Sequence, residues 1–513
     1  MTYLTIPICG KDLESCKEQI GSAVKAGAQM LELRTDYLQT LDTNILKNLL
    51  AEAKKTALPV IVTCRDAKEG GQNNIPAKIR KNILIDAVKF GADLIDCEFS
   101  NFINFEDDIQ NVLADNKKTK LILSEHNFKE PFENLAEIYE EMYSVWPDAI
   151  AKTAYNATHI NDCFAAFDIL HEYGEKAIAI CMGPAGAISR IMAKKLGSFL
   201  TFSNLGGDHQ TAPGQVSIEL MKKLYRYDAM NKETKFYGVI GDPIGHSISP
   251  AVHNSCFAAK KMNSVYLPLL VTGGKPEFDT FLNNINSRPW LDFKGFSITI
   301  PHKVNALEYA QEKGEYIEPV AVQIGAANTL SIGKNGRISG YNTDYTGAMT
   351  ALTEVMGISK KELKGKKVAC LGAGGVARAI IAGLTDVGAK VTIYNRTLTK
   401  AEGLAKEFQC HFADVDKLRK LDADIIINCT SIGMSPNDNE SPLPKECIKP
   451  SHTVFDTVYN PKETMLLKDA KAAGAKVVHG TEMFVYQAAE QFKLFTQTDC
   501  PMEIMRETIS KSL

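Results

Sequence analysis

The sequence predicts an α/β protein: a closed barrel of parallel strands and helices of the (β/α)8 TIM type, followed by a two-lobed α/β unit. The first observation is that eight apolar runs recur at intervals of about 22 to 35 residues across the first 205 positions. Segments with helical apolar spacing, such as 12–26 and 77–90, lie between these runs. The second observation is a short buried strand at 366–371 that leads into glycines and then a helix, which is typical of an open parallel sheet.

The eight apolar runs are the expected barrel strands, and polar reactive residues stand at nearly every carboxyl end. The runs are 3–9, 30–34, 59–65, 94–99, 120–126, 149–155, 177–183 and 199–205. Barrels of this type carry their chemistry at the carboxyl ends of the strands. At those ends the sequence places Glu32, Arg34, Arg65, Glu98, His126, Lys152 and Met182. We therefore expect a catalytic rim there.

Composition and charge are ordinary for a globular protein and exclude several classes. The 513 residues are 45% hydrophobic, and 58 basic against 61 acidic residues give a formal net charge of −3, so neither nucleic acid nor an anionic membrane is an expected partner. The 12 cysteines form no CxxC pair and no cysteine–histidine cluster, so no metal site is expected. The N-terminus looks like a strand rather than a signal or transit peptide, and no run of about 18 apolar residues occurs, so we expect a cytoplasmic protein.

The chain is too long for one hydrophobic core, so several domains are expected. The charged stretch 228–235 lacks apolar periodicity and is the expected linker after a barrel domain spanning 1–227. A new α/β pattern begins at 236, and a further shift occurs near 337–344.

Lys152 is the expected nucleophile of the barrel. Because it follows apolar strand residues, it should be partly desolvated, which lowers the pKa of its amine and frees it to attack a ketone. His126 is the expected proton carrier, and Glu69 could orient its imidazole. The guanidinium groups that could bind a carboxylate are those of Arg34, Arg65 and Arg190. A lysine at a strand end is more often a solvated surface residue, but the coincidence of these groups at one barrel face favours a Schiff-base site for a small keto acid.

Six ordered motifs within residues 3–227 resemble those of type I 3-dehydroquinate dehydratase. They are Leu31-Glu-Leu-Arg-Thr-Asp36, Thr63-Cys-Arg-Asp-Ala-Lys-Glu-Gly-Gly71, Ser124-Glu-His-Asn-Phe128, Lys152-Thr-Ala, Met182-Gly-Pro-Ala-Gly-Ala-Ile-Ser-Arg190 and Ala212-Pro-Gly-Gln215. The resemblance implies an imine between Lys152 and the substrate, with His126 as general acid/base supported by Glu69. It implies substrate contacts from Glu32, Arg34, Arg65, Arg190, Thr211 and Gln215. The family usually has serine where this chain has Thr211, so the loop there could close differently.

The second part contains a glycine-rich loop that is typical of a dinucleotide site. The loop comprises Gly372, Ala373, Gly374, Gly375, Val376 and Ala377, and it lies between a buried strand and a helix. The next strand, 390–394, ends without the acidic residue that holds the 2′-hydroxyl of NAD. The residues expected to accept a 2′-phosphate are Asn395, Arg396, Thr397 and Lys400. The sequence therefore favours NADP.

Reduction of a ketone or oxidation of an alcohol also needs a proton carrier. Lys303 and Asp344 are the candidates, because a lysine–aspartate pair can relay a proton near the reacting oxygen. Ser247 and Ser249 lie two residues apart and would face the same side if their stretch were extended, where they could bind a carboxylate. A turn rich in serine and proline is the structural alternative for these two residues.

Residues 236–513 resemble shikimate dehydrogenase. The motifs are Gly241-Asp-Pro-Ile-Gly-His-Ser-Ile-Ser-Pro250, Ser297-Ile-Thr-Ile-Pro-His-Lys303, Gly325-Ala-Ala-Asn328, Gly340-Tyr-Asn-Thr-Asp344, the glycine loop, Asn395-Arg-Thr397, Asn428-Cys-Thr-Ser431 and Gly480-Thr-Glu-Met-Phe-Val-Tyr-Gln487. The resemblance implies that Lys303 and Asp344 are the catalytic pair. It implies shikimate contacts from Ser247, Ser249, Thr299, Asn328, Tyr459 and Gln487, and cofactor contacts from Thr430, Ser431, Gly480 and Met483. It also implies a substrate lobe at 236–337, completed by 484–513, and a Rossmann NADP lobe at 338–483.

Together the two resemblances imply a bifunctional shikimate-pathway enzyme. The barrel would dehydrate 3-dehydroquinate to 3-dehydroshikimate, which the second part would reduce to shikimate with NADPH. Two rival hypotheses stay open: an aldolase or dehydratase barrel fused to a quinate dehydrogenase, and a catalytically inactive metabolite sensor. The presence of Lys152, His126, Lys303 and Asp344 disfavours the sensor.

Overall fold

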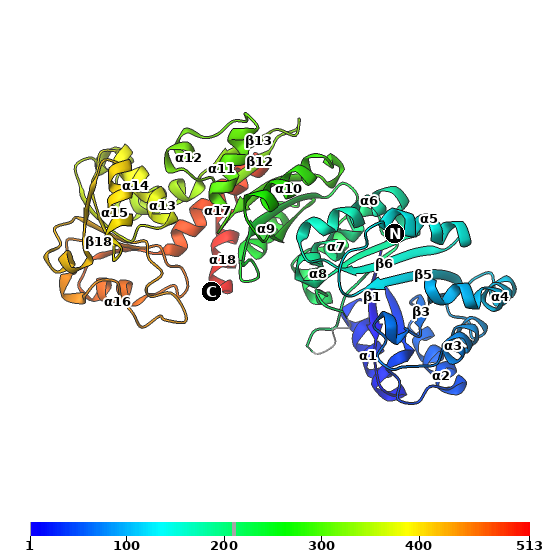
Figure 1. The fold of residues 1–513 in the computed structure, drawn as a ribbon. Helices are drawn as coiled ribbons and strands as arrows, with labels where there is room; N and C mark the ends of the chain where they lie inside the picture. The colour runs from blue at the N-terminus through cyan, green and yellow to red at the C-terminus, as the bar shows by residue number, and fades with distance from the viewer. Residues whose placement is uncertain (1, 208–211) are drawn as a thin grey trace. The chain divides into compact units, whose positions relative to one another are not determined.

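The computed structural model describes residues 2–207 and 212–513, and the chain divides into two compact units. One unit comprises Met1–Phe236 and Asn263–Asp292, and the other comprises Tyr237–Met262 and Phe293–Leu513. Figure 1 shows both units, and each is described below by itself.

The first unit contains the predicted (β/α)8 barrel, which is confirmed. Its eight-stranded sheet has the order β7-β6-β5-β4-β3-β2-β1-β8, and β1 pairs in parallel with both β2 and β8. Phe199 N–H, just before β8, donates to the Ala177 carbonyl at the start of β7 (3.0 Å), which brings the two ends of the sheet together. The strands are β1 (Tyr3–Ile8), β2 (Met30–Arg34), β3 (Val60–Thr63), β4 (Leu94–Glu98), β5 (Lys120–Asn127), β6 (Ile150–Asn156), β7 (Ala177–Met182) and β8 (Leu200–Phe202).

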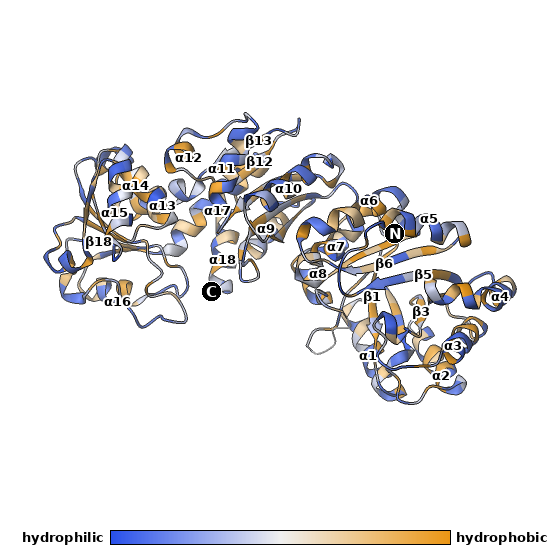
Figure 2. Ribbon diagram, in the orientation of Figure 1, coloured by the Kyte–Doolittle hydropathy of each residue, from blue (hydrophilic) through white to orange (hydrophobic). Residues whose placement is uncertain are grey.

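Amphipathic helices surround the strands. Each turns an apolar face to the barrel, so blue and orange residues alternate along the helix ribbons in Figure 2. The first helix shows the end signals well: Asp12 accepts a hydrogen bond from Ser15 N–H (2.8 Å), and Gly27 ends the helix at φ +84°. The helices are α1 (Leu13–Ala26), α2 (Thr43–Lys54), α3 (Ala77–Lys89), α4 (Phe99–Asp115), α5 (Leu135–Val145), α6 (Cys163–Tyr173), α7 (Gly183–Leu196) and α8 (Ile218–Lys223). The unit also holds β10 (Ser264–Leu270) and α10 (Lys275–Asn286).

The barrel interior changes from apolar to polar along the strands, and this change positions the site. Inward-facing residues near the strand starts form an apolar cluster that includes Leu94, Ile122 and Ile150. Because side chains of a strand alternate, the residues two positions further along also point inward. Those residues are Asp96, Ser124 and Lys152, and all three are buried. Polar chemistry therefore begins one layer above the apolar floor of the barrel.

The second unit has two sheets. In the first sheet β9, β11, β12 and β13 stand in that order, and β12 pairs antiparallel with both β11 and β13. The strands are β9 (Lys235–Gly241), β11 (Phe293–Ile298), β12 (Thr329–Ile332) and β13 (Ile338–Tyr341), and the helices of this part are α9 (Ser249–Ala259), α11 (Lys303–Glu312) and α12 (Pro319–Ile324).

The other sheet is the predicted Rossmann sheet, and it is also confirmed. Its six parallel strands have the order β16-β15-β14-β17-β18-β19. From β14 the chain first adds strands on one side of the sheet and then, from β17 on, adds them on the other side. Ligands bind outside the carboxyl ends of the strands at such a switch point. The strands are β14 (Lys367–Leu371), β15 (Lys390–Tyr394), β16 (His411–Ala413), β17 (Ile425–Asn428), β18 (Thr453–Asp456) and β19 (Lys476–Val478). The helices of this part are α13 (Thr343–Met356), α14 (Gly375–Asp386), α15 (Leu398–Glu407) and α16 (Met465–Ala472), whereas α17 (Gly480–Thr496) and α18 (Met502–Ser512) return to pack against the first sheet and α9.

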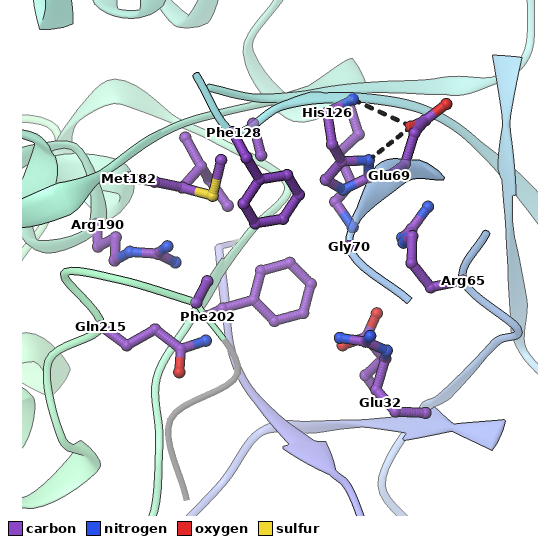
Figure 3. A pocket seen from close by; sticks show the side chains of 15 residues that line it. Glu32, Arg65, Glu69, Gly70, His126, Phe128, Met182, Arg190, Phe202 and Gln215 are labelled. Carbon is purple, nitrogen blue, oxygen red and sulfur yellow. Dashed lines mark hydrogen bonds and ion pairs between the residues drawn. The ribbon is translucent and has the colours of Figure 1, made fainter. Parts of the chain in front are cut away.

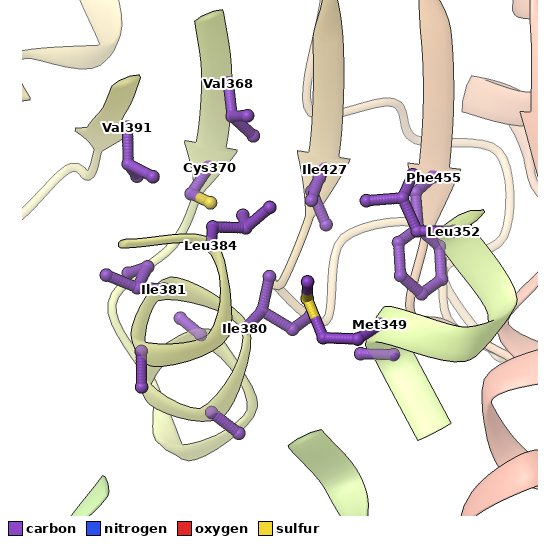
Figure 4. Packing of buried hydrophobic residues seen from close by; sticks show 14 of the residues in the cluster. Met349, Leu352, Val368, Cys370, Ile380, Ile381, Leu384, Val391, Ile427 and Phe455 are labelled. Atoms are coloured by element: carbon purple, nitrogen blue, oxygen red, sulfur yellow. The ribbon is translucent and has the colours of Figure 1, made fainter. Parts of the chain in front are cut away.

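A dense apolar cluster fixes α14 beneath this sheet (Figure 4). Ile380 and Leu384 of α14 are completely or almost completely buried against Cys370 of β14 and Ile427 of β17. Burying a side chain of this size stabilises the fold by about 1.5–3 kcal/mol. The packing holds the start of α14 at the edge where the glycine loop leaves β14.

Candidate active sites

A pocket at the carboxyl ends of the barrel strands gathers the residues predicted for the first site (Figure 3). The predicted residues that line it are Glu32, Arg34, Arg65, Glu69, His126, Lys152, Met182, Arg190 and Gln215. Thr211 lies outside the described residues. Two aromatic side chains that the motif analysis did not single out as site residues, Phe128 and Phe202, complete the wall.

Lys152 is buried as predicted, but its position and partners differ from the expectation. Rather than ending its strand, it lies inside β6, which continues to Asn156, and it is only 3% exposed. Its ammonium is not isolated, because Nζ donates to Asp96 Oδ2 at 2.7 Å and lies 4.9 Å from the ring centre of Phe202. Desolvation is therefore accompanied by an ion pair, which the sequence argument did not include.

Asp96 is the functional candidate that the sequence reasoning missed. Its Oδ1 accepts hydrogen bonds from Ser124 Oγ (2.6 Å) and from an Arg65 guanidinium nitrogen (2.9 Å). Burial alone would raise the pKa of Asp96, but the charges of Arg65 and Lys152 hold it well below its usual range. Asp96 is thus a carboxylate with donors on both oxygens. The available signal was an acid at an inward position within the strand, two residues before Glu98.

His126 and Glu69 form the predicted pair. His126 Nδ1 lies 3.0 Å from Glu69 Oε2, and the same oxygen accepts the His126 backbone N–H (3.1 Å). Burial, together with Arg65 and Lys152, lowers the pKa of His126 well below its ordinary value, so its imidazole is neutral. Burial raises the pKa of Glu69 to about 7. An ionised Glu69 accepts Nδ1–H and leaves Nε2 as the hydrogen-bond acceptor.

The arginines of the pocket are not equivalent. Arg34 makes two hydrogen bonds to Asp36 (2.9 and 2.8 Å), and Arg65 is held by Asp96 and by Glu98 (2.8 Å). Among the described residues, Arg190 Nε has no hydrogen-bond partner, and burial lowers the pKa of its guanidinium to about 10. Arg190 is therefore the cation in this pocket that most needs an anion.

The second unit contains a cavity of about 370 Å³ that gathers the residues predicted for the second site. The predicted residues that line it are Ser247, Ser249, Thr299, Lys303, Asn328, Asp344, Val376, Tyr459, Gly480, Met483 and Gln487. Ser247 and Ser249 are not extended: Ser249 begins α9, and its N–H donates to Ser247 Oγ (3.3 Å). The turn geometry nevertheless leaves both residues on the cavity wall.

Lys303 and Asp344 are an ion pair with a distance of 2.5 Å between Nζ and Oδ2. Lys303 begins α11, and Asp344 lies in the first turn of α13. Asn328 fixes that turn, because its Oδ1 accepts from Thr343 N–H (2.8 Å). The first turns of two helices, whose backbones are held by hydrogen bonds, thus place the two charges.

Except for Gly480 and Met483 of α17, the predicted cofactor residues lie on or directly after three loops at one edge of the Rossmann sheet. Parallel pairing aligns Leu371 with Tyr394 and with Asn428, so the loops after these three residues are neighbours. They carry the glycine loop, then Asn395, Arg396 and Thr397 with Lys400 one turn into α15, and finally Thr430 and Ser431. Arg396, Thr397, Lys400 and Ser431 are exposed, whereas Ala377 is buried in the core beneath the loop.

The glycine loop fits a dinucleotide phosphate. Gly372 has φ +108°, and a Cβ there would lie 2.9 Å from the Thr430 side chain. Helix α14 begins at Gly375 without a side-chain cap, so its first N–H groups remain available to an anion. A Cβ at Gly374 or Gly375 would meet no atom within 4 Å, which shows open space for a ligand. With Arg396 and without an acid after β15, the edge suits NADP.

Comparison with known proteins agrees with both predicted families. The family model for type I 3-dehydroquinase matches residues 4–232. Three further models match the second part of the chain: the shikimate dehydrogenase substrate binding domain at 239–330, shikimate/quinate 5-dehydrogenase at 354–438, and the shikimate 5′-dehydrogenase C-terminal domain at 480–509. A chloroplastic bifunctional 3-dehydroquinate dehydratase/shikimate dehydrogenase of Arabidopsis thaliana is 36% identical over 99% of this chain and 84% of its own length.

Relatives of the second part alone are also found. An NADP(+) shikimate dehydrogenase of Methanosarcina acetivorans is 42% identical over 54% of this chain and 99% of its own length. A crystal structure of a shikimate dehydrogenase with NADP+ superposes with a TM-score of 0.50 and 37% identity, and it covers 55% of this chain and 96% of that one. Among residues 2–207 and 212–513, no helix has the length and apolar content that crossing a bilayer requires.

Proposed function

The chain belongs to the family of bifunctional 3-dehydroquinate dehydratase/shikimate dehydrogenases, and from this premise we propose how its residues perform the two reactions. It is a shikimate-pathway enzyme that dehydrates 3-dehydroquinate to 3-dehydroshikimate and reduces that product to shikimate with NADP as cofactor. The observation that carries the residue assignments is that each unit gathers its predicted reactive groups around one pocket.

In the barrel, Lys152 condenses with the substrate ketone. The ammonium first gives up a proton so that its neutral amine can add to the carbonyl carbon. After that proton returns and one water leaves, the product is an iminium, so the nitrogen carries one positive charge before and after the condensation. The iminium withdraws electrons and acidifies the neighbouring C–H. His126, neutral and oriented by Glu69, takes that proton and returns it to the departing hydroxyl, which leaves as water. A water molecule then hydrolyses the iminium, which releases 3-dehydroshikimate and restores Lys152.

Substrate binding in the barrel rests on the cationic wall of the pocket. Arg190 is assigned to the substrate carboxylate, because its buried guanidinium has an unsatisfied nitrogen. Glu32, whose Oε1 already accepts from Thr63 (2.8 Å), is assigned to a substrate hydroxyl. Gln215, Arg34 and Arg65 complete the contacts, and Thr211 is assigned to the same role by its place in the motif.

In the second unit, Lys303 and Asp344 move the proton. As the ketone of 3-dehydroshikimate becomes an alcohol, its oxygen takes a proton from the pair, and Asp344 keeps the lysine positioned. NADPH supplies the hydride to the carbonyl carbon. Ser247 and Ser249 are assigned to the substrate carboxylate. Thr299, Asn328, Tyr459 and Gln487 are assigned to its hydroxyls.

The cofactor assignment follows the three loops at the edge of the Rossmann sheet. The glycine loop from Gly372 to Ala377 holds the pyrophosphate, and Asn395, Arg396, Thr397 and Lys400 hold the 2′-phosphate. Thr430 and Ser431 lie on the loop after β17, beside the glycine loop, and Gly480 and Met483 line the cavity where the nicotinamide must meet the substrate.

The domain borders and the compartment are also proposals. We assign 1–227 to the dehydratase, 228–235 to a linker, 236–337 with 484–513 to the substrate lobe, and 338–483 to the NADP lobe, which the four family matches support. The compact units divide the chain differently at one point, because 263–292 belongs to the first unit. All 12 cysteines are free, which favours a reducing compartment, and we assign the cytoplasm.

One assay tests the proposal. The protein is incubated with 3-dehydroquinate and NADPH, and shikimate and NADPH oxidation are followed together. Shikimate should form, while Lys152→Met should stop the sequence at 3-dehydroquinate and Lys303→Met should stop it at 3-dehydroshikimate. Faster turnover of quinate than of shikimate in the reverse reaction would instead make the second unit a quinate dehydrogenase. Binding without turnover of either substrate would indicate a sensor.

A further inference from the structure

The strongest unassigned feature is a buried charge cluster around Asp96. Its three donors are Lys152 Nζ at 2.7 Å, Arg65 at 2.9 Å and Ser124 Oγ at 2.6 Å. Asp96 is 1% exposed and comes from β4, whereas Lys152 comes from β6, so the contact passes over the intervening strand β5 inside the barrel. Taking these charged groups out of water costs free energy that their mutual attraction need not repay, so the cluster calls for a functional explanation.

The chemistry assigned to Lys152 supplies that use. The resting ammonium carries one positive charge, and the iminium that replaces it carries one positive charge at the same nitrogen. A carboxylate fixed beside that atom can therefore neutralise the cation in both states without moving. A buried iminium with no counter-ion would lose its N–H proton, and the neutral imine withdraws electrons from the neighbouring carbon far less than the iminium does.

Two further contacts keep Asp96 in this role. Arg65 cannot lose its proton, so its permanent charge keeps Asp96 ionised, and Asp96 does not compete with His126 for protons. Ser124 stands in register with Lys152 on the neighbouring strand and donates to Asp96 Oδ1, whereas the lysine donates to Oδ2. Glu98 also binds Arg65, at 2.8 Å, and it accepts its other hydrogen bonds from Asp66 N–H (3.0 Å) and Asn101 Nδ2 (3.1 Å) rather than from Lys152.

We propose that Asp96 is the fixed counter-ion of the Lys152 nitrogen, and that it stabilises the substrate iminium throughout the dehydration while Arg65 and Ser124 position it. The inference rests on the proposed imine at Lys152. It adds a residue that acts on the intermediate itself rather than on the proton transfer.

The test compares full-length Asp96→Asn with Glu98→Gln. Both variants remove one negative charge from the partners of Arg65, but only the first removes it from Lys152. Each protein is mixed with 3-dehydroquinate and quenched with borohydride at set times. It is then digested, and the peptides are analysed by mass spectrometry. We expect Asp96→Asn to lower both kcat and the yield of reduced adduct on Lys152 by about 100-fold or more, with a much smaller change in KM. In Glu98→Gln the loss of kcat and of adduct should be smaller than in Asp96→Asn by a factor of at least about ten.

The outcomes separate the two levels of the argument. Absence of adduct on Lys152 in the unsubstituted chain would refute the proposed imine itself. Normal adduct yield in Asp96→Asn, or an equal loss in both variants, would refute only the counter-ion role. Shikimate dehydrogenase activity reports the integrity of the second unit throughout.

Should Asp96→Asn fail to fold, its stability becomes the measurement. If Asp96 neutralises Lys152, the variant is destabilised by an unpaired buried cation, and adding Lys152→Met should restore the thermal transition of the barrel. A double variant that is no more stable than Asp96→Asn would contradict the pairing.

Discussion

At the residue scale, burial prepares the His126–Glu69 pair to work near neutral pH. Desolvation lowers the pKa of His126 and raises that of Glu69 to about 7, so the two shifts act in opposite directions on one hydrogen bond. Above this pH, Glu69 is a carboxylate that accepts Nδ1–H and leaves Nε2 ready to take a proton. Below it, a protonated Glu69 no longer holds that tautomer.

This pairing predicts an acidic limb in the dehydratase pH profile. As pH falls through about 7, kcat should decline by about tenfold per pH unit, because the active form of Glu69 is its ionised form. Glu69→Gln should lower the plateau and remove this limb. Initial rates of 3-dehydroshikimate formation across buffers of constant ionic strength give both curves. An unchanged limb in Glu69→Gln would assign the titration to another group.

Arg190 yields a prediction about binding rather than proton transfer. Its unsatisfied Nε and burial indicate that it awaits an anion, so Arg190→Met should raise the KM for 3-dehydroquinate by about 10- to 100-fold. The same change should not lower the melting temperature of the barrel, because it removes an uncompensated buried charge. Steady-state kinetics and calorimetry measure the two effects. A destabilised barrel with an unaltered KM would show that Arg190 is structural.

At the element scale, loops that leave the parallel strands of the Rossmann sheet carry most of the proposed cofactor site, and particular glycines are needed there for identifiable reasons. Gly372 combines a positive φ with a close approach to Thr430, while Gly403, in the middle of α15, has no atom within 4 Å of an added Cβ. The two positions therefore form a matched pair for substitution.

Gly372→Ala should impair cofactor binding selectively. The strained backbone costs of the order of 1–3 kcal/mol locally and displaces the loop that receives the pyrophosphate. We expect the KM for NADPH to rise at least about tenfold, while dehydratase turnover is unaffected. Gly403→Ala should leave the KM for NADPH unchanged and stabilise its helix slightly. Equal effects of the two changes on NADPH binding would exclude the loop argument.

The regular elements and the end-of-strand residues could be predicted from the sequence, because strand spacing and motif order are local properties. The burial of Asp96 against Lys152 could not, since it joins two strands that are not neighbours and depends on how the barrel closes. The extended geometry considered for Ser247 and Ser249 was wrong for a local reason: the chain enters α9 at Ser249. Both serines nevertheless line the cavity, because the turn and the start of a helix can direct two side chains to one side as a strand can.

At the scale of the whole molecule, the two units perform consecutive reactions with separate sets of residues. The lining of the barrel pocket comes wholly from residues 32–215, and that of the second cavity wholly from residues 239–491. Each site should therefore be removable without loss of the other. Lys152→Met is expected to retain full reduction of added 3-dehydroshikimate, and Lys303→Met full dehydration of 3-dehydroquinate.

Mixing these two single-site variants tests the central claim most directly. Supplied with 3-dehydroquinate and NADPH, neither variant alone should produce shikimate. An equimolar mixture should produce it, because 3-dehydroshikimate released by one chain is reduced by the other. Shikimate production by the Lys152→Met chain alone, or none from the mixture, would contradict a chain with two independent active sites.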